Sequence, residues 1–135
     1  MDQQVSGSCL CGAVRFLISG AFESFFLCHC SRCRKDSGSA HSANLFSSKA
    51  EIEWLAGLDH VRTFQLPSTR HVKSFCSACG SAVPMLQADK ALLVVPAGSL
   101  DSRLDIRPDA RICYASRAEW TDQLAPVPTV DGLPG

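Results

Sequence analysis

The sequence predicts a mainly β fold in a single domain, for three reasons. The chain has 135 residues, a length that suits one hydrophobic core. Short apolar runs recur along it, and no window shows three turns of helical periodicity except a weak helical turn at 31–36. Glycine or proline interrupts the apolar runs at fairly regular intervals, at Gly20, Gly38, Gly57, Pro67, Gly80 and Gly98.

The expected strands follow one another in chain order. Residues 12–19 alternate small or apolar side chains with Arg15, a pattern that favours a strand, and 24–27 form the next apolar run. After a cysteine-rich stretch the same kind of pattern returns six times, at 40–46, 51–57, 60–66, 71–76, 81–86 and 91–95.

The last part of the chain is predicted to contain a strand around Cys113, followed by a tail without regular structure. Cys113 lies between two apolar residues and is predicted to be a core thiol in a strand. Residues 125–135 are rich in proline and glycine, so we expect them to wrap the surface or fray. The predicted domain therefore spans residues 1–124, followed by a short tail.

The composition argues against several classes of function. Hydrophobic residues make up 46% of the chain and charged residues 19%, which is typical of a globular protein. Thirteen basic residues balance thirteen acidic ones, so no long-range field attracts nucleic acid or an anionic membrane. Residues 1–7 lack the basic and apolar segments of an export signal, and no apolar run approaches a membrane span. We therefore expect a cytoplasmic protein without a nucleic-acid or membrane partner.

Eight cysteines in such a chain need an explanation. Thiols seldom pair in a reducing compartment, so metal binding or catalysis is the common reason for many cysteines there. Cys9 and Cys11 are separated by one residue, as are Cys28 and Cys30, and neighbours that close cannot easily form a disulfide with each other. Disulfides between distant cysteines remain an alternative.

Two similar turns predict one closed metal site. The sequences CLCG at 9–12 and CSACG at 76–80 each place two cysteines before a glycine. The glycine permits the bend that lets both sulfurs reach one ion, and it lets backbone N–H groups approach the thiolates. Four sulfurs complete a tetrahedral zinc shell, so the site is predicted to be structural, with ligands Cys9, Cys11, Cys76 and Cys79.

Other groupings of these cysteines stay open at this point. The four thiols could be buried as small hydrophobic groups without any ion. A zinc ribbon could instead use Cys9, Cys11, Cys28 and Cys30, although it would leave Cys33, Cys76 and Cys79 unused.

The stretch CHCSRC at 28–33 contains three further cysteines, Cys28, Cys30 and Cys33. Three protein ligands leave a position for water or substrate, which is the arrangement of catalytic zinc. His29 could be a fourth ligand, but it lies between two ligands on a tight turn and is expected to point away. His41, His60 and His71 fall in strand-like runs and are expected to be ordinary core or surface residues.

Three thiolate ligands also restrict the chemistry. They make zinc a weaker Lewis acid, which disfavours hydrolysis by bound hydroxide. A soft exogenous thiol would bind readily and stay nucleophilic, so the sequence favours making or breaking a carbon–sulfur bond. Arg32, Arg34 and Lys35 would offset the charge of the site, and the arginines could hold carboxylates of a peptide-like thiol. A solvated basic turn is the alternative.

Two other uses of the cysteines fit the sequence less well. A Cys–His hydrolase needs an isolated thiol with a separate base, which the dense clustering argues against. A redox pair, Cys30 with Cys33 or Cys76 with Cys79, lacks the βαβ context of thioredoxin-like proteins.

Four segments of the chain resemble one known family. GSCLCGAVRF, CHCSRCRKDSGSA, FCSACGSAV and VPAGSLD stand in the order and spacing of the glutathione-dependent formaldehyde-activating enzymes, a family that includes centromere protein V-like domains. The resemblance runs from about Gly7 to Trp120. It implies a mainly β, tent-like single domain of short antiparallel strands around zinc knuckles.

The resemblance also implies ligands and an activity. It assigns a structural zinc to Cys9, Cys11, Cys76 and Cys79, and a second zinc with an open position to Cys28, Cys30 and Cys33. The activity that it implies is the addition of glutathione to formaldehyde, classed as carbon–sulfur lyase activity. The chain departs from the family near its end, where Arg111 precedes Ile112 in place of a frequent histidine, while Trp120 stands in its usual position.

Two functions are therefore compatible with the sequence. The first is a zinc-dependent carbon–sulfur lyase acting on adducts of glutathione or a similar thiol with formaldehyde or another small electrophile. In it the trio would hold the catalytic ion, and Arg32 or Arg34 would orient the substrate. The second is a non-catalytic binding module in which both zinc ions are structural.

Overall fold

The structure, a computed structural model, describes residues 3–87, 89 and 91–135. It confirms the mainly β prediction, with one short α-helix, α1 (Ser31–Ser37). Residues 1, 2, 88 and 90 of the predicted domain lie outside this description. The strands are β1 (Gln4–Ser8), β2 (Arg15–Ser19), β3 (Ser24–Cys28), β4 (Ser42–Ser47), β5 (Glu51–Ala56), β6 (Val61–Gln65), β7 (Val72–Cys76), β8 (Met85–Gln87), β9 (Leu92–Pro96) and β10 (Ala110–Ile112).

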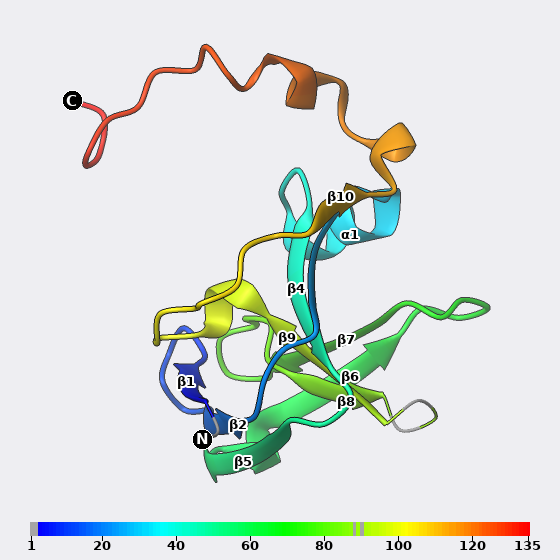
Figure 1. The fold of residues 1–135 in the computed structure, drawn as a ribbon, viewed down its shortest axis with the longest axis vertical. Coiled ribbons are helices and arrows are strands. Elements are labelled where there is room, and N and C mark those ends of the chain that lie inside the picture. The colour runs from blue at the N-terminus through cyan, green and yellow to red at the C-terminus, as the bar shows by residue number, and fades with distance from the viewer. Residues whose placement is uncertain (1–2, 88, 90) are drawn as a thin grey trace.

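The strands form three sheets (Figure 1). The largest has the order β10-β3-β4-β9-β8, the second is β1-β2-β5, and β6 pairs with β7. All neighbours are antiparallel except β10, which runs parallel to β3 and places Ile112 opposite Cys28. In the described part of the chain, four short 3₁₀ segments connect or follow the strands, at Leu58–His60, Ala97–Ser99, Tyr114–Ser116 and Glu119–Gln123.

The core lies between the two larger sheets. Phe16 and Ile18 alternate along β2 with exposed or half-buried neighbours, and both are fully buried, as is Leu45 of β4. Trp54 of β5 packs edge-on to Phe16, with ring centroids 5.9 Å apart. Burial of each such side chain contributes roughly 1.5–3 kcal/mol, so this core holds β2 and β4 in place. Several of the cysteines lie at or next to strand ends, at β1, β3 and β7.

Several expected strands are shorter than predicted, and one assignment is wrong. The run at 12–19 becomes a strand only from Arg15, because Gly12 has a φ of 82° and belongs to the preceding turn. Of the run at 81–86, only Met85 and Leu86 enter a strand.

Cys113 is not a core thiol: it is exposed, has a φ of 52° and lies after β10. Strand β1 was not predicted.

Residues 125–135 contain no helix or strand, and all of them are exposed. Figure 1 shows them extending away from the sheets. Among the described residues, no helix has the length and apolar character needed to cross a membrane.

Gly57 is needed where β5 meets the turn that precedes β2. Its φ is 78°, and a Cβ there would overlap the carbonyl oxygen of Ala13. We expect Gly57→Ala to lower the free energy of unfolding by at least about 2 kcal/mol, because it adds left-handed strain to a backbone clash. Urea denaturation measures the change. Gly98→Ala is the control, since nothing lies within 4 Å of a Cβ at that position; an equal loss in both variants would contradict the explanation.

Candidate metal centres

Four cysteines from two distant turns meet at one point. One ligand atom from each of Cys9, Cys11, Cys76 and Cys79 lies within 4.8 Å of the other three. The Sγ atoms of Cys9 and Cys11 are 3.7 Å apart, and those of Cys11 and Cys76 are 4.0 Å apart. Sulfurs bound tetrahedrally to zinc at about 2.3 Å lie ~3.8 Å from one another, so this quartet fits a closed zinc shell.

Strand ends bring the quartet together. Cys9 follows β1 directly, and Cys76 is the last residue of β7. Backbone groups then support the sulfurs: the N–H of Val14 donates to Cys9 Sγ at 3.2 Å. Gly12 and Gly80 take left-handed φ angles of 82° and 78°, as the predicted bends require. The alternative ribbon grouping, which joins the first turn to Cys28 and Cys30, is not the one that forms.

The thiols of the quartet have unequal pKa values. Hydrogen bonds from the side chain and backbone of Ser81 lower the pKa of Cys79 to about 5. A backbone hydrogen bond from Ala13 lowers the pKa of Cys11, but Cys9, burial and the other thiols outweigh it and raise that pKa to about 11. Full deprotonation at neutral pH therefore needs a positive ion, and the quartet can hold zinc.

The second cluster is built on the start of α1. Its sulfurs, from Cys28, Cys30 and Cys33, lie within 4.8 Å of one another. Cys28 is the last residue of β3, and Cys30 caps the helix, accepting a hydrogen bond from the Cys33 N–H at 3.2 Å. The helix ends at Gly38, whose φ of 65° lets its N–H bond back to Arg34.

Burial affects the three thiols of the trio unequally. It raises the pKa of Cys28 well above the usual thiol range, and it raises that of Cys33 as well. Burial acts on Cys30 in the same direction, but hydrogen bonds from the Cys33 backbone and from the two other thiols outweigh it, so the pKa of Cys30 is lowered. This trio can hold a metal ion, which would keep all three sulfurs as thiolates.

Among the described residues, no histidine or carboxylate completes the trio into a set of four. His29 lies between Cys28 and Cys30 in the chain but turns into the protein, where it is only 1% exposed. It packs against the rings of His41 and Tyr114, each with a centroid 5.0 Å away. Burial lowers the pKa of His29, and the nearby His41 lowers it further, which favours the neutral ring. The eight cysteines are all free thiols, and no disulfide forms.

A cavity of about 420 Å³ lies beside the trio. Cys33 borders it, and polar residues of α1, β4, β7 and the position just before β7 line it, among them Asp36, Ser42, Asn44, His71 and Lys73. Its volume lies within the range of about 300–1,000 Å³ that is typical of small-molecule sites. The trio therefore borders a ligand-sized cavity through Cys33.

An ion-paired group forms part of the cavity wall. His71 Nε2 lies 2.7 Å from Asp36 Oδ2, and Lys73 Nζ lies 3.0 Å from Asp36 Oδ1. The side chains of His71 and Asp36 are 20% and 19% exposed. The prediction that His71 is an ordinary strand residue missed this pairing, since 35 residues separate it from Asp36.

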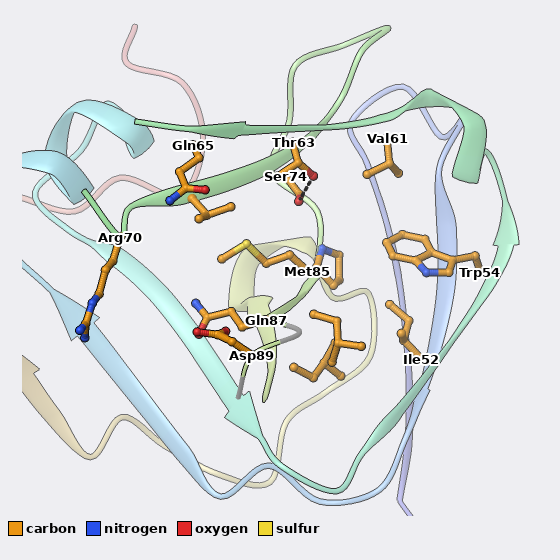
Figure 2. Close-up of a pocket in the computed structure, with 14 residues that line it drawn as sticks. Ile52, Trp54, Val61, Thr63, Gln65, Arg70, Ser74, Met85, Gln87 and Asp89 are labelled. Atoms are coloured by element: carbon orange, nitrogen blue, oxygen red, sulfur yellow. Dashed lines mark hydrogen bonds between the residues drawn. The ribbon is translucent and has the colours of Figure 1, made fainter. Parts of the chain in front are cut away.

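A larger cavity of about 720 Å³ adjoins the first one and shares Val72, Ser74 and Met85 with it. Figure 2 shows the apolar side chains of Ile52 and Trp54 on one side of it, and Arg70, Gln87 and Asp89 on the other. The Thr63 and Ser74 hydroxyls, 2.9 Å apart, hydrogen-bond across its wall.

The sequence of this chain is similar to that of a known protein family. A sequence profile described as glutathione-dependent formaldehyde-activating enzyme matches residues 4–116. The chain belongs to the glutathione-dependent formaldehyde-activating enzyme family. A Halomonas elongata protein that is provisionally named as such an enzyme is 33% identical over 128 residues, which cover 87% of this chain and 80% of that protein.

The fold is also found in a solved structure. The crystal structure of a Rhodobacter sphaeroides protein superposes with a TM-score of 0.55 and 22% identity, covering 74% of this chain and 91% of that one. At this identity the likeness shows the fold alone. Membership of the formaldehyde-activating family thus comes from the sequence, and the likeness in structure agrees with its β architecture.

The arginines near the trio occupy different surroundings. Arg32 is exposed on α1, and neither it nor Arg34 lines the cavity beside Cys33. Arg34 instead borders a cavity of about 200 Å³ together with Trp120, and its Nε is buried with no hydrogen-bond partner among the described residues. Arg111 lies on β10 opposite Leu27 and acts electrostatically on His29.

Proposed function

We propose that this protein is a zinc-dependent carbon–sulfur lyase acting on adducts of glutathione, or a similar thiol, with formaldehyde or another small electrophile. The observation that carries the proposal is the incomplete trio beside a cavity, in a chain whose other cluster has four ligands. Structural zinc normally has four protein ligands, whereas three are typical of catalytic zinc. Membership of the family supports the same reaction.

Each part of the site has a distinct role in this proposal. Cys28, Cys30 and Cys33 would hold the catalytic zinc, and Cys9, Cys11, Cys76 and Cys79 the structural one. Zinc bound by the trio would bind the sulfur of a thiol and keep it as a nucleophilic thiolate at neutral pH. The cavity would hold the electrophile and part of the thiol compound.

The predicted substrate contacts, Arg32 and Arg34, have unequal positions in this site. Arg32 is exposed and lies between two of the metal-binding cysteines in the chain, so it is the better candidate for binding a carboxylate of glutathione.

We place the protein in the cytoplasm, because its unpaired thiols suit a reducing compartment. Its partner is a small thiol, rather than nucleic acid or a membrane.

Cobalt substitution tests whether the trio binds a thiol. In protein loaded with cobalt(II), we expect glutathione at millimolar concentrations to change the sulfur-to-cobalt absorption, because a fourth thiolate joins the trio. Cys33→Ser should remove the change, and S-methylglutathione, which has no free thiol, should cause none. Absorption that stays unchanged across millimolar glutathione would contradict the lyase proposal and favour the alternative, a binding module in which both ions are structural.

A further inference from the structure

We propose that His71, held by Asp36, is the catalytic residue that transfers the proton during carbon–sulfur bond cleavage. The inference rests on the proposed function and names the proton acceptor of that reaction. It starts from the juxtaposition of Cys33, Asp36 and His71 around one cavity.

The helix and a strand bring these residues together. Asp36 follows Cys33 by three positions in α1, so both project from the same face of the helix. His71 directly precedes β7, and its Nε2 lies 2.7 Å from Asp36 Oδ2. Lys73 anchors the same carboxylate at 3.0 Å and also donates to the Asp36 carbonyl oxygen at 2.9 Å. The carboxylate is therefore fixed from two sides.

This contact selects one form of the neutral imidazole. An ionised Asp36 accepts a hydrogen bond from Nε2–H of His71, which leaves the lone pair on Nδ1. Nδ1 makes no hydrogen bond to any described residue, and His71 is one of the residues that line the cavity. Nδ1 is thus available as a base, and Asp36 stabilises the imidazolium that forms when it takes a proton.

The other titratable groups that line the cavity do not match this arrangement. They are Cys33, His41, Asp36 and Lys73. Cys33 belongs to the trio, and Lys73 is already paired with Asp36. His41 packs against the ring of His29 at 5.0 Å, and its Nδ1 is buried without a partner among the described residues. Of the two histidines that line the cavity, His71 is the one held by a carboxylate.

The proton balance of the reaction is simple. The hydroxymethyl adduct of a thiol has a hydroxyl proton, and cleavage moves that proton to Nδ1 of His71. The electrons of the O–H bond form the carbonyl of formaldehyde, and those of the broken C–S bond leave on sulfur as thiolate. In the reverse direction the thiolate attacks the carbonyl carbon, and imidazolium returns the proton to oxygen. No oxidant or reductant is required.

The test compares His71→Gln with His60→Gln, a control at an exposed histidine outside the cavity. Proton NMR measures enzyme-dependent exchange between glutathione and its hydroxymethyl adduct above the buffer rate. We expect His71→Gln to slow it by roughly 10²-fold to 10⁴-fold, as for other general bases, with exogenous imidazole restoring part of the rate in His71→Gly. The control should keep the wild-type rate.

Two further measurements separate the possible outcomes. The glutathione titration of cobalt-loaded His71→Gln should match that of wild type within about threefold, since this residue acts on the proton rather than on thiol binding. The ¹⁵N NMR signals of His71 should show Nε2–H in wild type and change in Asp36→Asn. A wild-type rate in His71→Gln, or glutathione affinity lost in parallel with rate, overturns this inference alone. Wild-type protein that neither binds glutathione nor exchanges the adduct overturns the proposed function as well.

Discussion

Cys79→Ser is expected to abolish the native fold at room temperature. The quartet joins the end of β1 to the end of β7, with Cys11 and Cys76 separated by 65 positions along the chain, and a closed zinc site of this kind contributes on the order of 10 kcal/mol. Domains of this size are stable by only about 5–15 kcal/mol, so losing one ligand removes most or all of the stability. Circular dichroism and a thermal melt measure the loss.

Cys113→Ser is the matched control for this variant. Cys113 is exposed and belongs to neither cluster, so its thiol contributes nothing to a metal site. It should melt within a few degrees of wild type. If Cys79→Ser and Cys113→Ser melted at the same temperature, the quartet would not be a structural centre.

A chelator is expected to remove the metal of the trio first and to reduce activity to the uncatalysed background while the fold persists. The trio spans only six positions, 28–33, whereas the quartet clamps two distant segments that must separate to release their ion. The trio ion also has three anchors instead of four. Zinc release, exchange rate and circular dichroism are followed together during incubation with the chelator.

Cys33→Ser serves as the control for the order of release. This variant should lack the fast phase of zinc release, keep the slow one, and melt at nearly the wild-type temperature. Loss of secondary structure together with the first equivalent of zinc would show that the trio is structural, in agreement with the binding-module alternative.

The division of seven cysteines into a quartet and a trio could be predicted from short sequence motifs. Each turn of the quartet has its glycine directly after the second cysteine, and these glycines adopt the left-handed backbone that the bend requires. The trio lies within one short segment, so chain connectivity alone keeps Cys28 near Cys30 and Cys33. The sequence also indicated the mainly β class, because its apolar runs are short and separated by turn residues.

Features that depend on distant pairing could not be predicted in this way. Strand β10 has three residues, and its parallel partner β3 lies more than eighty residues earlier, as the hydrogen bond from Phe25 to Asp109 illustrates with a separation of 84. Strand β1 reads QVSGS, which has few strongly β-forming residues, but Gly7 lets the ring of Phe16 pack where a Cβ would lie. The pair of His71 and Asp36 likewise has no local signature.

Seven sulfurs are expected to form a complete quartet and an incomplete trio around separate metal ions. Anomalous diffraction at the zinc absorption edge, from crystals of the untreated protein, tests it most directly. We expect two peaks in each chain, one surrounded by Cys9, Cys11, Cys76 and Cys79 and the other by Cys28, Cys30 and Cys33. A folded chain with no peak, a single peak shared by both turns and the trio, or sulfurs joined in disulfides would contradict it.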